Sequence, residues 1–268
     1  MSYSAQNETP RENAVSTVDY QVAGSVATIT LDAPERRNAL SAQLLAQLRA
    51  ALDAAEADGA VRSVVLSHTG SVFCSGMDLT TVTDVPAAEQ PINAFPVLLQ
   101  RLWEFGKPVL ARVAGKARAG GIGLIAASDI AIGTPAADFA FTEVRLGLVP
   151  AVISAPVLPR MTPRAVLELC LTGETFDAAR AAEIGLLNRV VVDVDAELAR
   201  CTELLAGCEP KALAATKQLL RRDRSGRSLA EDLSAMSALS AQYFASDEAA
   251  EGIAAFRQKR PPAWAVNR

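Results

Sequence analysis

The chain has 268 residues, of which 50% are hydrophobic and 21% charged, a composition typical of a folded protein rather than a disordered one. Its 30 acidic residues outnumber 26 lysines and arginines, and the net charge of −4 argues against general nucleic-acid binding, which needs a basic surface. One histidine and four cysteines without C-x-x-C spacing argue against a zinc site.

The cysteines and the first residues bear on the compartment. Four scattered cysteines in a chain of this size are typical of reduced thiols, so we expect a cytoplasmic protein. Residues 1–16 are polar, which predicts a mobile tail rather than a signal peptide. No apolar run of about 18 residues is free of charges and turn residues, so we expect no membrane-spanning helix and no membrane partner.

Strands and helices are predicted to alternate in the first two thirds of the chain. In chain order we predict a hairpin over 18–22 and 26–31, a helix over 41–59, a strand over 63–67, a helix over 92–104, a strand over 108–113, a helix that ends at 127, and strands over 130–132 and 139–141. This alternation predicts an α/β architecture with right-handed crossovers. After the strand 63–67 we expect a loop that starts at His68 and places this side chain at the surface.

From Thr162 onward the pattern becomes mostly helical. We predict helices over 163–171, 177–184, 196–205, 210–221, 229–244 and 247–256, with one strand over 189–192. The chain is therefore divided into a tail (1–16), an α/β core (17–200) and a helical C-terminal region (201–268). The segment 229–244 is apolar on more than one face, which is typical of a helix covered by other protein and indicates a homo-oligomer.

Two segments rich in small residues are candidates for ligand contact. They are residues 73–79 (FCSGMDL) and 115–124 (GKARAGGIGL). Small residues let the backbone approach a ligand and leave N–H groups open at a helix start. Two such loops side by side could offer two donors to one developing oxyanion. Each loop could instead be only a tight turn between a strand and a helix.

Glu143 is the candidate acid–base residue. It follows an apolar strand and precedes an apolar turn, and apolar surroundings would raise the pKa of its carboxyl and suit it to proton transfer. The alternative is a surface ion pair with Arg145 or another arginine.

Taken together, these segments resemble the crotonase (enoyl-CoA hydratase/isomerase) family over about residues 17–265. Residues 73–79 resemble its F-x-x-G-x-D-[LI] motif, and 119–121 resemble its glycine turn. The resemblance implies a crotonase-like ββα spiral core with a helical trimerisation region. It also implies that the N–H groups of Met77 and Gly120 form an oxyanion hole for an acyl-CoA thioester, with Glu143 as the catalytic carboxylate.

The resemblance further implies a set of substrate-binding positions. They are Asn38, Ala39, Ser75, Gly76, Asp78, Leu79, Gly121, Gly123, Thr142, Phe256 and Lys259. It implies no metal and no cofactor apart from the coenzyme A carried by the substrate, and a homotrimer or hexamer as the assembly. Arg118 and Arg145 are either solvated or meet a carboxylate on the acyl group.

The sequence departs from the family at one position. Two-glutamate hydratases carry their second catalytic glutamate three residues after the middle glycine, and Gly123 stands there. We expect an enoyl-CoA hydratase or dehydratase that works with one carboxylate, followed by a Δ3,Δ2-enoyl-CoA isomerase and, third, a weakly active acyl-CoA-binding protein. With a hydratase, Gly123→Glu is expected to give a modest gain in hydration, limited by Ile122 and Leu124.

Overall fold

The computed structural model describes residues 16–80, 91–222 and 229–265. Its strands are β1 (Val18–Ala23), β2 (Val26–Leu31), β3 (Ser63–His68), β4 (Val72–Cys74), β5 (Val109–Val113), β6 (Lys116–Arg118), β7 (Ile130–Gly133), β8 (Asp138–Ala140), β9 (Phe176–Asp177) and β10 (Arg189–Val190). Its helices are α1 (Ala42–Ala57), α2 (Pro91–Glu104), α3 (Gly120–Ala127), α4 (Ala151–Val157), α5 (Pro163–Thr172), α6 (Ala178–Glu183), α7 (Val194–Ala206), α8 (Pro210–Arg221), α9 (Leu229–Phe244) and α10 (Asp247–Gln258).

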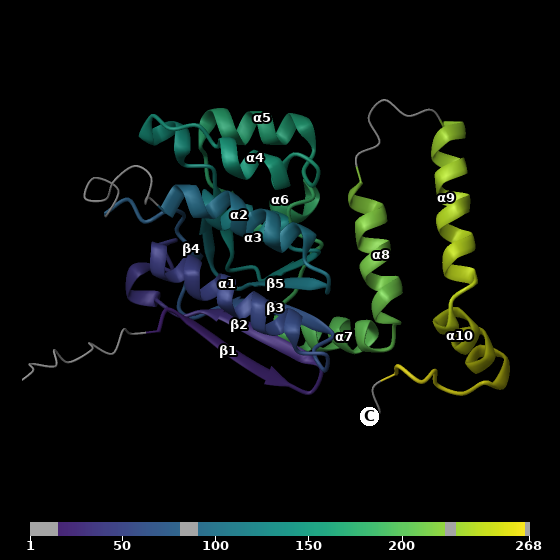
Figure 1. Cartoon of the computed structure of the whole chain (residues 1–268). Coiled ribbons are helices and arrows are strands. Elements are labelled where there is room, and N and C mark those ends of the chain that lie inside the picture. Colours follow the sequence, from purple (N-terminus) through teal and green to yellow (C-terminus); the bar gives the residue numbers. More distant parts are fainter. Residues whose placement is uncertain (1–15, 81–90, 223–228, 266–268) are drawn as a thin grey trace, which may run out of the picture.

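The strands form two sheets, which confirms the α/β fold class. The larger sheet has the order β1-β2-β3-β5-β7-β10, and only its β1–β2 hairpin is antiparallel. The smaller sheet has the order β4-β6-β8-β9, with parallel pairing from β4 to β8. Figure 1 shows α1, α2, α4 and α5 above strands β1 to β3, whereas α7 packs on β3, β5 and β7.

Strand β3 explains why helices cover both faces of the larger sheet. All six of its residues are buried, and consecutive side chains point to opposite faces. Val64 and Leu66 join the main core, whereas Val65 packs with Leu198 and Cys201 of α7 in a smaller cluster. Because both faces of β3 are buried, its sequence is a nearly continuous apolar run rather than an alternation of apolar and polar residues.

The prediction of a loop that starts at His68 is wrong in part. His68 is the last residue of β3 and is only 6% exposed, and β4 forms over Val72–Cys74 within the expected loop. The ring of His68 accepts a hydrogen bond from the Ala114 N–H at 3.1 Å and contacts Phe73 edge-on. The histidine therefore joins the two sheets instead of facing solvent.

The C-terminal helices stand beside the core. The expected domain boundary at residue 200 falls inside α7, which packs on β3, β5 and β7, so the helices that leave the sheet start with α8. Figure 1 shows α8 next to the core, α9 beyond it, and α10 at the base of α9. Arg62 ties this region to the core through the carbonyl oxygens of Cys208, at 2.7 Å, and Trp264, at 3.4 Å.

Within the described residues, no helix has the combined length and apolar character that crossing a bilayer requires.

Candidate active site

Two loops meet where β4 and β6 end. Gly76 follows β4 with a φ of +90°, a conformation that favours glycine. A β-carbon on Gly76 would lie 3.0 Å from the Cβ of Ala119 and 3.3 Å from the carbonyl oxygen of Arg118. Because no side chain separates the loops, the backbone around Met77 lies against the start of α3.

The second loop turns sharply into α3. Ala119 has a φ of +47°, and α3 begins at the next residue. A β-carbon on Gly120 would lie 2.7 Å from the Leu40 side chain and 3.3 Å from the ring of Phe95, so a larger residue would force these side chains to shift. The turn directs the N-terminus of α3, with its unpaired N–H groups, toward the space in front of both loops.

Met77 and Gly120 each present a backbone N–H to this space. Among the hydrogen bonds of the described residues, none is donated by either of these N–H groups, whereas the neighbouring Asp78 N–H bonds to the Leu40 carbonyl at 3.3 Å. Met77 and Gly120 both line a cavity of about 310 Å³. The arrangement can bind one oxygen atom that carries negative charge.

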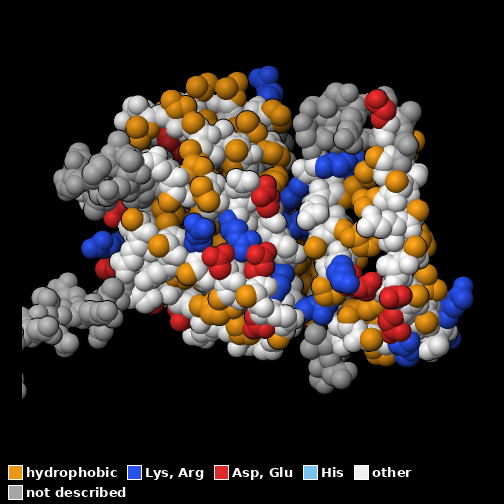
Figure 2. All heavy atoms as spheres, in the orientation of Figure 1, with side chains coloured by type: hydrophobic (Ala, Val, Ile, Leu, Met, Phe, Trp, Pro, Cys, Tyr) orange, Lys and Arg blue, Asp and Glu red, His pale blue; other side chains and the backbone are white. Residues whose placement is uncertain are grey.

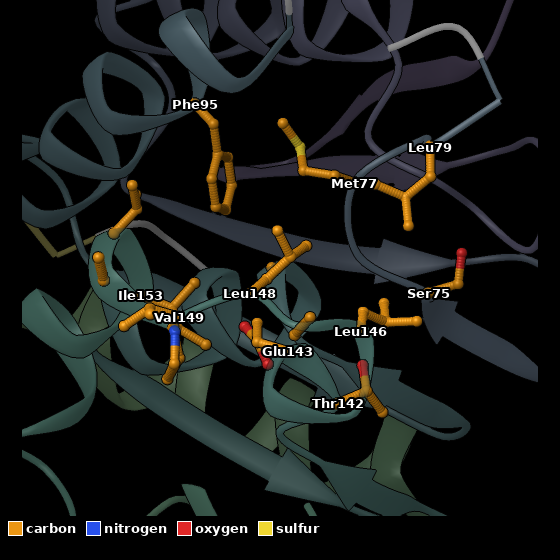
Figure 3. Close-up of a pocket in the computed structure, with 15 residues that line it drawn as sticks. Ser75, Met77, Leu79, Phe95, Thr142, Glu143, Leu146, Leu148, Val149 and Ile153 are labelled. Carbon is orange, nitrogen blue, oxygen red and sulfur yellow. The ribbon is translucent and has the colours of Figure 1, made fainter. Parts of the chain in front are cut away.

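Glu143 is the charged residue of this cavity. It starts a 3₁₀ turn over Glu143–Leu146, which follows β8 after two intervening residues and is capped by Gly147. Figure 3 shows its carboxylate inside the cavity, with Phe95 and Met77 on the far side and Leu148, Val149 and Ile153 next to it. The described lining is therefore mostly apolar around the Glu143 carboxylate.

The surroundings of Glu143 favour its protonated form. Its Oε2 atom is buried and has no hydrogen-bond partner among the described residues. Burial raises the pKa of the carboxyl above its ordinary value, and a hydrogen bond from its own backbone offsets this only in part. A desolvated, unpaired carboxylate at this position is suited to accept and return a proton.

Ile153 covers Gly123, the position at which the family resemblance would place a second glutamate. A β-carbon on Gly123 would lie 2.8 Å from the Ile153 Cγ2 atom and 3.5 Å from the Phe95 ring, and both of these side chains line the cavity. Gly123 itself is not a lining residue. The space is thus filled from α4, and not by Ile122 and Leu124 as expected from the sequence.

The structure brings part of the predicted site together. The predicted residues that line the cavity are Ser75, Met77, Leu79, Gly120, Thr142 and Glu143. The predicted residues outside the lining are Asn38, Ala39, Gly76, Asp78, Gly121, Gly123, Phe256 and Lys259. Their contact with a substrate stays a prediction.

Two of the outer residues support the loops. Asn38 is fully buried; its Oδ1 accepts the Ala33 N–H at 2.8 Å, and its amide donates to the carbonyls of Thr69 and Val72. Asp78 is 5% exposed and accepts hydrogen bonds from the N–H and hydroxyl of Thr80. These side chains fix the backbone that carries Met77.

Phe256 and Lys259 lie far along the C-terminal region. Phe256 in α10 is 84% exposed, and Lys259 follows at the end of the same helix. Neither residue lines the described cavity, so the contact of Phe256 and Lys259 with coenzyme A stays a prediction.

Arg118 and Arg145 do not face the cavity. Arg118 forms an ion pair with Asp138 and also donates to the Asp138 carbonyl at 2.9 Å. Arg145 points toward the end of α5, where it lies against Gly173 and reaches the Thr172 carbonyl at 3.5 Å. The described lining of the cavity therefore offers no arginine to a carboxylate on the acyl group.

Among the described residues no cluster of metal-ligating side chains occurs.

Sequence reasoning missed most of the apolar wall, which comes from α2, from the segment 146–150 and from the start of α4. The missed lining residues are Phe95, Ala119, Leu146, Leu148, Val149, Pro150, Ala151, Val152 and Ile153. The apolar residues after Gly147 are a visible signal of a cavity wall. Gly147, Pro150 and Pro156, however, are typical of a turn rather than of the helix α4 that forms there.

The chain is similar to known proteins over most of its length. A model of the enoyl-CoA hydratase/isomerase family matches residues 21–267. Enoyl-CoA hydratase EchA19 of Mycobacterium tuberculosis is 32% identical over 249 residues, which cover 89% of this chain and 92% of that protein.

Solved structures resemble the fold as well. A crystal structure of an enoyl-CoA hydratase from Shewanella pealeana superposes with a TM-score of 0.89 and 31% identity, covering 94% of this chain and 97% of that one. An enoyl-CoA hydratase/isomerase from Marinobacter aquaeolei gives a TM-score of 0.85 and 32% identity, covering 93% and 99%.

Proposed function

The chain belongs to the enoyl-CoA hydratase/isomerase family, and from this premise we propose that it hydrates a 2-enoyl-CoA thioester, or catalyses the reverse dehydration, with Glu143 as its single acid–base residue. The observation that carries this proposal is the buried, unpartnered Oε2 atom of Glu143 in a cavity that two free N–H groups also line. The name of the Mycobacterium tuberculosis relative supports hydration.

In the proposed mechanism the thioester carbonyl oxygen accepts hydrogen bonds from the N–H groups of Met77 and Gly120. Negative charge builds up on this oxygen as the enolate forms, and loss of one such donor typically costs about 2.7–4 kcal/mol of transition-state stabilisation. The Glu143 carboxylate takes a proton from water while the hydroxide oxygen bonds to C3. The same carboxyl then delivers the proton to C2, so one water is added and Glu143 returns to its starting state.

A Δ3,Δ2-enoyl-CoA isomerase is the second candidate, and the contact between Gly123 and Ile153 favours it. Isomerisation needs one carboxylate and no water: Glu143 removes a proton from C2 of the 3-enoyl thioester and returns it to C4. The apolar side chain of Ile153 covers the position from which a second carboxylate would hold water. The choice between hydration and isomerisation is therefore made by experiment.

The deciding experiment is a panel of 2-enoyl-CoA and 3-enoyl-CoA thioesters, followed at the absorbance of the conjugated thioester. Hydration consumes this absorbance with 2-enoyl substrates, and isomerisation generates it with 3-enoyl substrates. A constant absorbance together with tight binding of acyl-CoA would reject both activities and support a binding protein. Glu143→Gln serves as the control for the enzyme preparation.

A further inference from the structure

A second cavity of about 390 Å³ lies between α2 and α4, next to the cavity of Glu143. Ala151 and Val152, at the start of α4, line both cavities, so the two cavities adjoin at these side chains. Ala151 is exposed and contributes only a methyl group to this shared edge. The second cavity is called the α2–α4 groove below.

The lining of the α2–α4 groove is suited to a hydrocarbon. Pro96 and Leu99 of α2 face Ala155 and Pro156 of α4, and no described lining residue is charged. Each methylene group that leaves water for such surroundings gains about 0.8 kcal/mol, which corresponds to about fourfold in affinity.

Trp103 forms the far end of the groove and is held firmly. The guanidinium carbon of Arg221 lies 4.1 Å from the centre of its ring, and that of Arg160 lies 5.0 Å away. Arg221 is fixed in turn by Asp129 at 2.8 Å. Two cations against one indole ring form a well-anchored wall.

The chemistry changes on the other side of Trp103. The next cavity shares Trp103 with the groove but is lined by Glu104, Lys217 and Arg221 among others. A hydrocarbon gains nothing by entering charged surroundings, so the favourable path ends at Trp103. Phe95 lines the Glu143 cavity, and the eight residues from there to Trp103 span about 12 Å of helix.

We propose that the α2–α4 groove receives the distal part of an apolar acyl chain and that Trp103 sets the chain-length limit. This proposal rests on the proposed function, because it assumes that the thioester is held between Met77 and Gly120. The shared lining residues Ala151 and Val152 identify the occupant, since they place the groove directly beside the cavity that holds the reacting carbons. The substrates are therefore medium- to long-chain acyl-CoA thioesters without a terminal charge.

The first test measures kcat/KM for a series of enoyl-CoA thioesters from four to sixteen carbons. We expect the value to rise by up to about fourfold per methylene group as the chain fills the groove, and to level off once the chain reaches Trp103. A profile that is flat, or that is highest for the four-carbon substrate, would overturn the proposal.

The second test blocks the groove at its middle. Ala155 is exposed and lines the groove, so Ala155→Phe fills it without disturbing the core. We expect full activity on the four-carbon substrate and loss of the advantage of longer chains. Leu158→Phe is the matched control, because Leu158 is exposed at the end of the same helix and lines neither cavity. An equal effect of Ala155→Phe on all chain lengths would contradict the proposal.

A third variant and a binding assay complete the design. Gln100→Phe narrows the groove close to Trp103, so only the longest chains should lose rate. Calorimetric binding of saturated acyl-CoA thioesters reads the same chain-length dependence without turnover. If no enoyl thioester reacts but affinity still increases with chain length and falls in Ala155→Phe, the proposed reaction fails while the groove stands. If the affinity for saturated acyl-CoA thioesters does not change with chain length, the groove proposal is wrong.

Discussion

Gly123 and Ile153 fit together so closely that a single added methyl group on the glycine would collide with the isoleucine. The distance from a β-carbon at 123 to the Ile153 Cγ2 atom would be 2.8 Å, and Ile153 is only 4% exposed. The contact joins the buried helix α3, whose first residue faces the cavity, to α4, which forms the cavity wall.

We expect Gly123→Ala to lower the free energy of unfolding by about 1–3 kcal/mol, the usual cost of overpacking. Helix propensity alone would favour alanine over glycine by about 1 kcal/mol, so a loss isolates the contact with Ile153. Urea denaturation of Gly123→Ala, Ile153→Ala and the double variant measures the coupling. The double variant should be more stable than the sum of the single effects predicts; strict additivity would reject the contact.

The same contact revises the expected outcome of Gly123→Glu. With Ile153 in place we expect a less stable protein with no gain in hydration, instead of the modest gain that the sequence suggested. Gly123→Glu/Ile153→Ala has room for the carboxylate and should hydrate 2-enoyl-CoA faster than Ile153→Ala alone. Faster hydration by Gly123→Glu alone would show that the Ile153 side chain moves aside and makes room for the carboxylate.

Local patterns explain which features the sequence predicts well. The hairpin β1–β2 and helix α1 follow from alternation and from leucine spacing, with Ser41 as the N-cap that accepts the Leu44 N–H at 3.2 Å. The cavity position of Glu143 also follows from its place after an apolar strand.

Features that depend on distant contacts are not visible in spacing. The helix α4 was missed because it has only seven residues, contains Pro156 and follows a segment typical of a turn. The position of His68 depends on Ala114, which lies 46 residues away in the chain. The contact of Gly123 with Ile153 likewise forms only when α3 and α4 pack.

The buried His68 predicts a loss of stability in mild acid. Burial is the main cause that lowers its pKa below the ordinary value, and its Nε2 atom accepts the Ala114 N–H only when the ring is neutral. Because the unfolded chain takes up the proton at a higher pH than the folded chain, stability is full above about pH 6.5 and falls as the pH decreases. The unfolding free energy should therefore fall between pH 7 and 5.

His68→Gln provides the control for this pH dependence, because glutamine does not titrate. Its unfolding free energy should be lower at pH 7 and should change less between pH 7 and 5. Equal slopes in both proteins would show that other groups dominate the acid sensitivity.

Exposed apolar side chains on α9 and α10 predict a homo-oligomer. Leu233, Phe244 and Phe256 are 57%, 73% and 84% exposed, and Figure 2 shows hydrophobic side chains along this part of the molecule. We expect sedimentation at micromolar concentration to give a trimer or a hexamer, and Leu233→Asp with Phe244→Asp to shift it toward monomer. A monomeric wild-type chain would refute this prediction.

Lys259 tests whether the C-terminal end reaches the nucleotide part of coenzyme A. A cation next to a phosphate strengthens binding of the nucleotide but not of pantetheine alone. Lys259→Ala should thus raise KM for CoA esters more than for pantetheine esters. Equal effects on the two esters would place Lys259 outside the substrate site.

Glu143→Gln should remove most turnover and leave binding of CoA esters intact. General acid–base catalysis contributes about 10²–10⁴-fold, and the amide keeps the shape of the acid without its proton transfer. Because burial raises the pKa of Glu143, the acidic limb of the wild-type kcat/KM profile should lie above the ordinary glutamate value of about 4.3. An unchanged kcat in the variant would exclude Glu143 from the mechanism.

The same substitution should stabilise the folded chain at neutral pH. A pKa that is higher in the folded state than in the unfolded state means that the stability is full below about pH 4.3 and is lost as the pH rises through the folded value. Glutamine resembles the protonated acid at every pH, so Glu143→Gln should have the higher Tm at pH 7.5, with the difference vanishing near pH 4. Glu174→Gln, at an exposed position after α5, is the control and should change Tm little at either pH. If Glu143→Gln instead lowered Tm at pH 7.5, the carboxylate would have to be paired in the folded protein, and the desolvated base on which the mechanism depends would not exist.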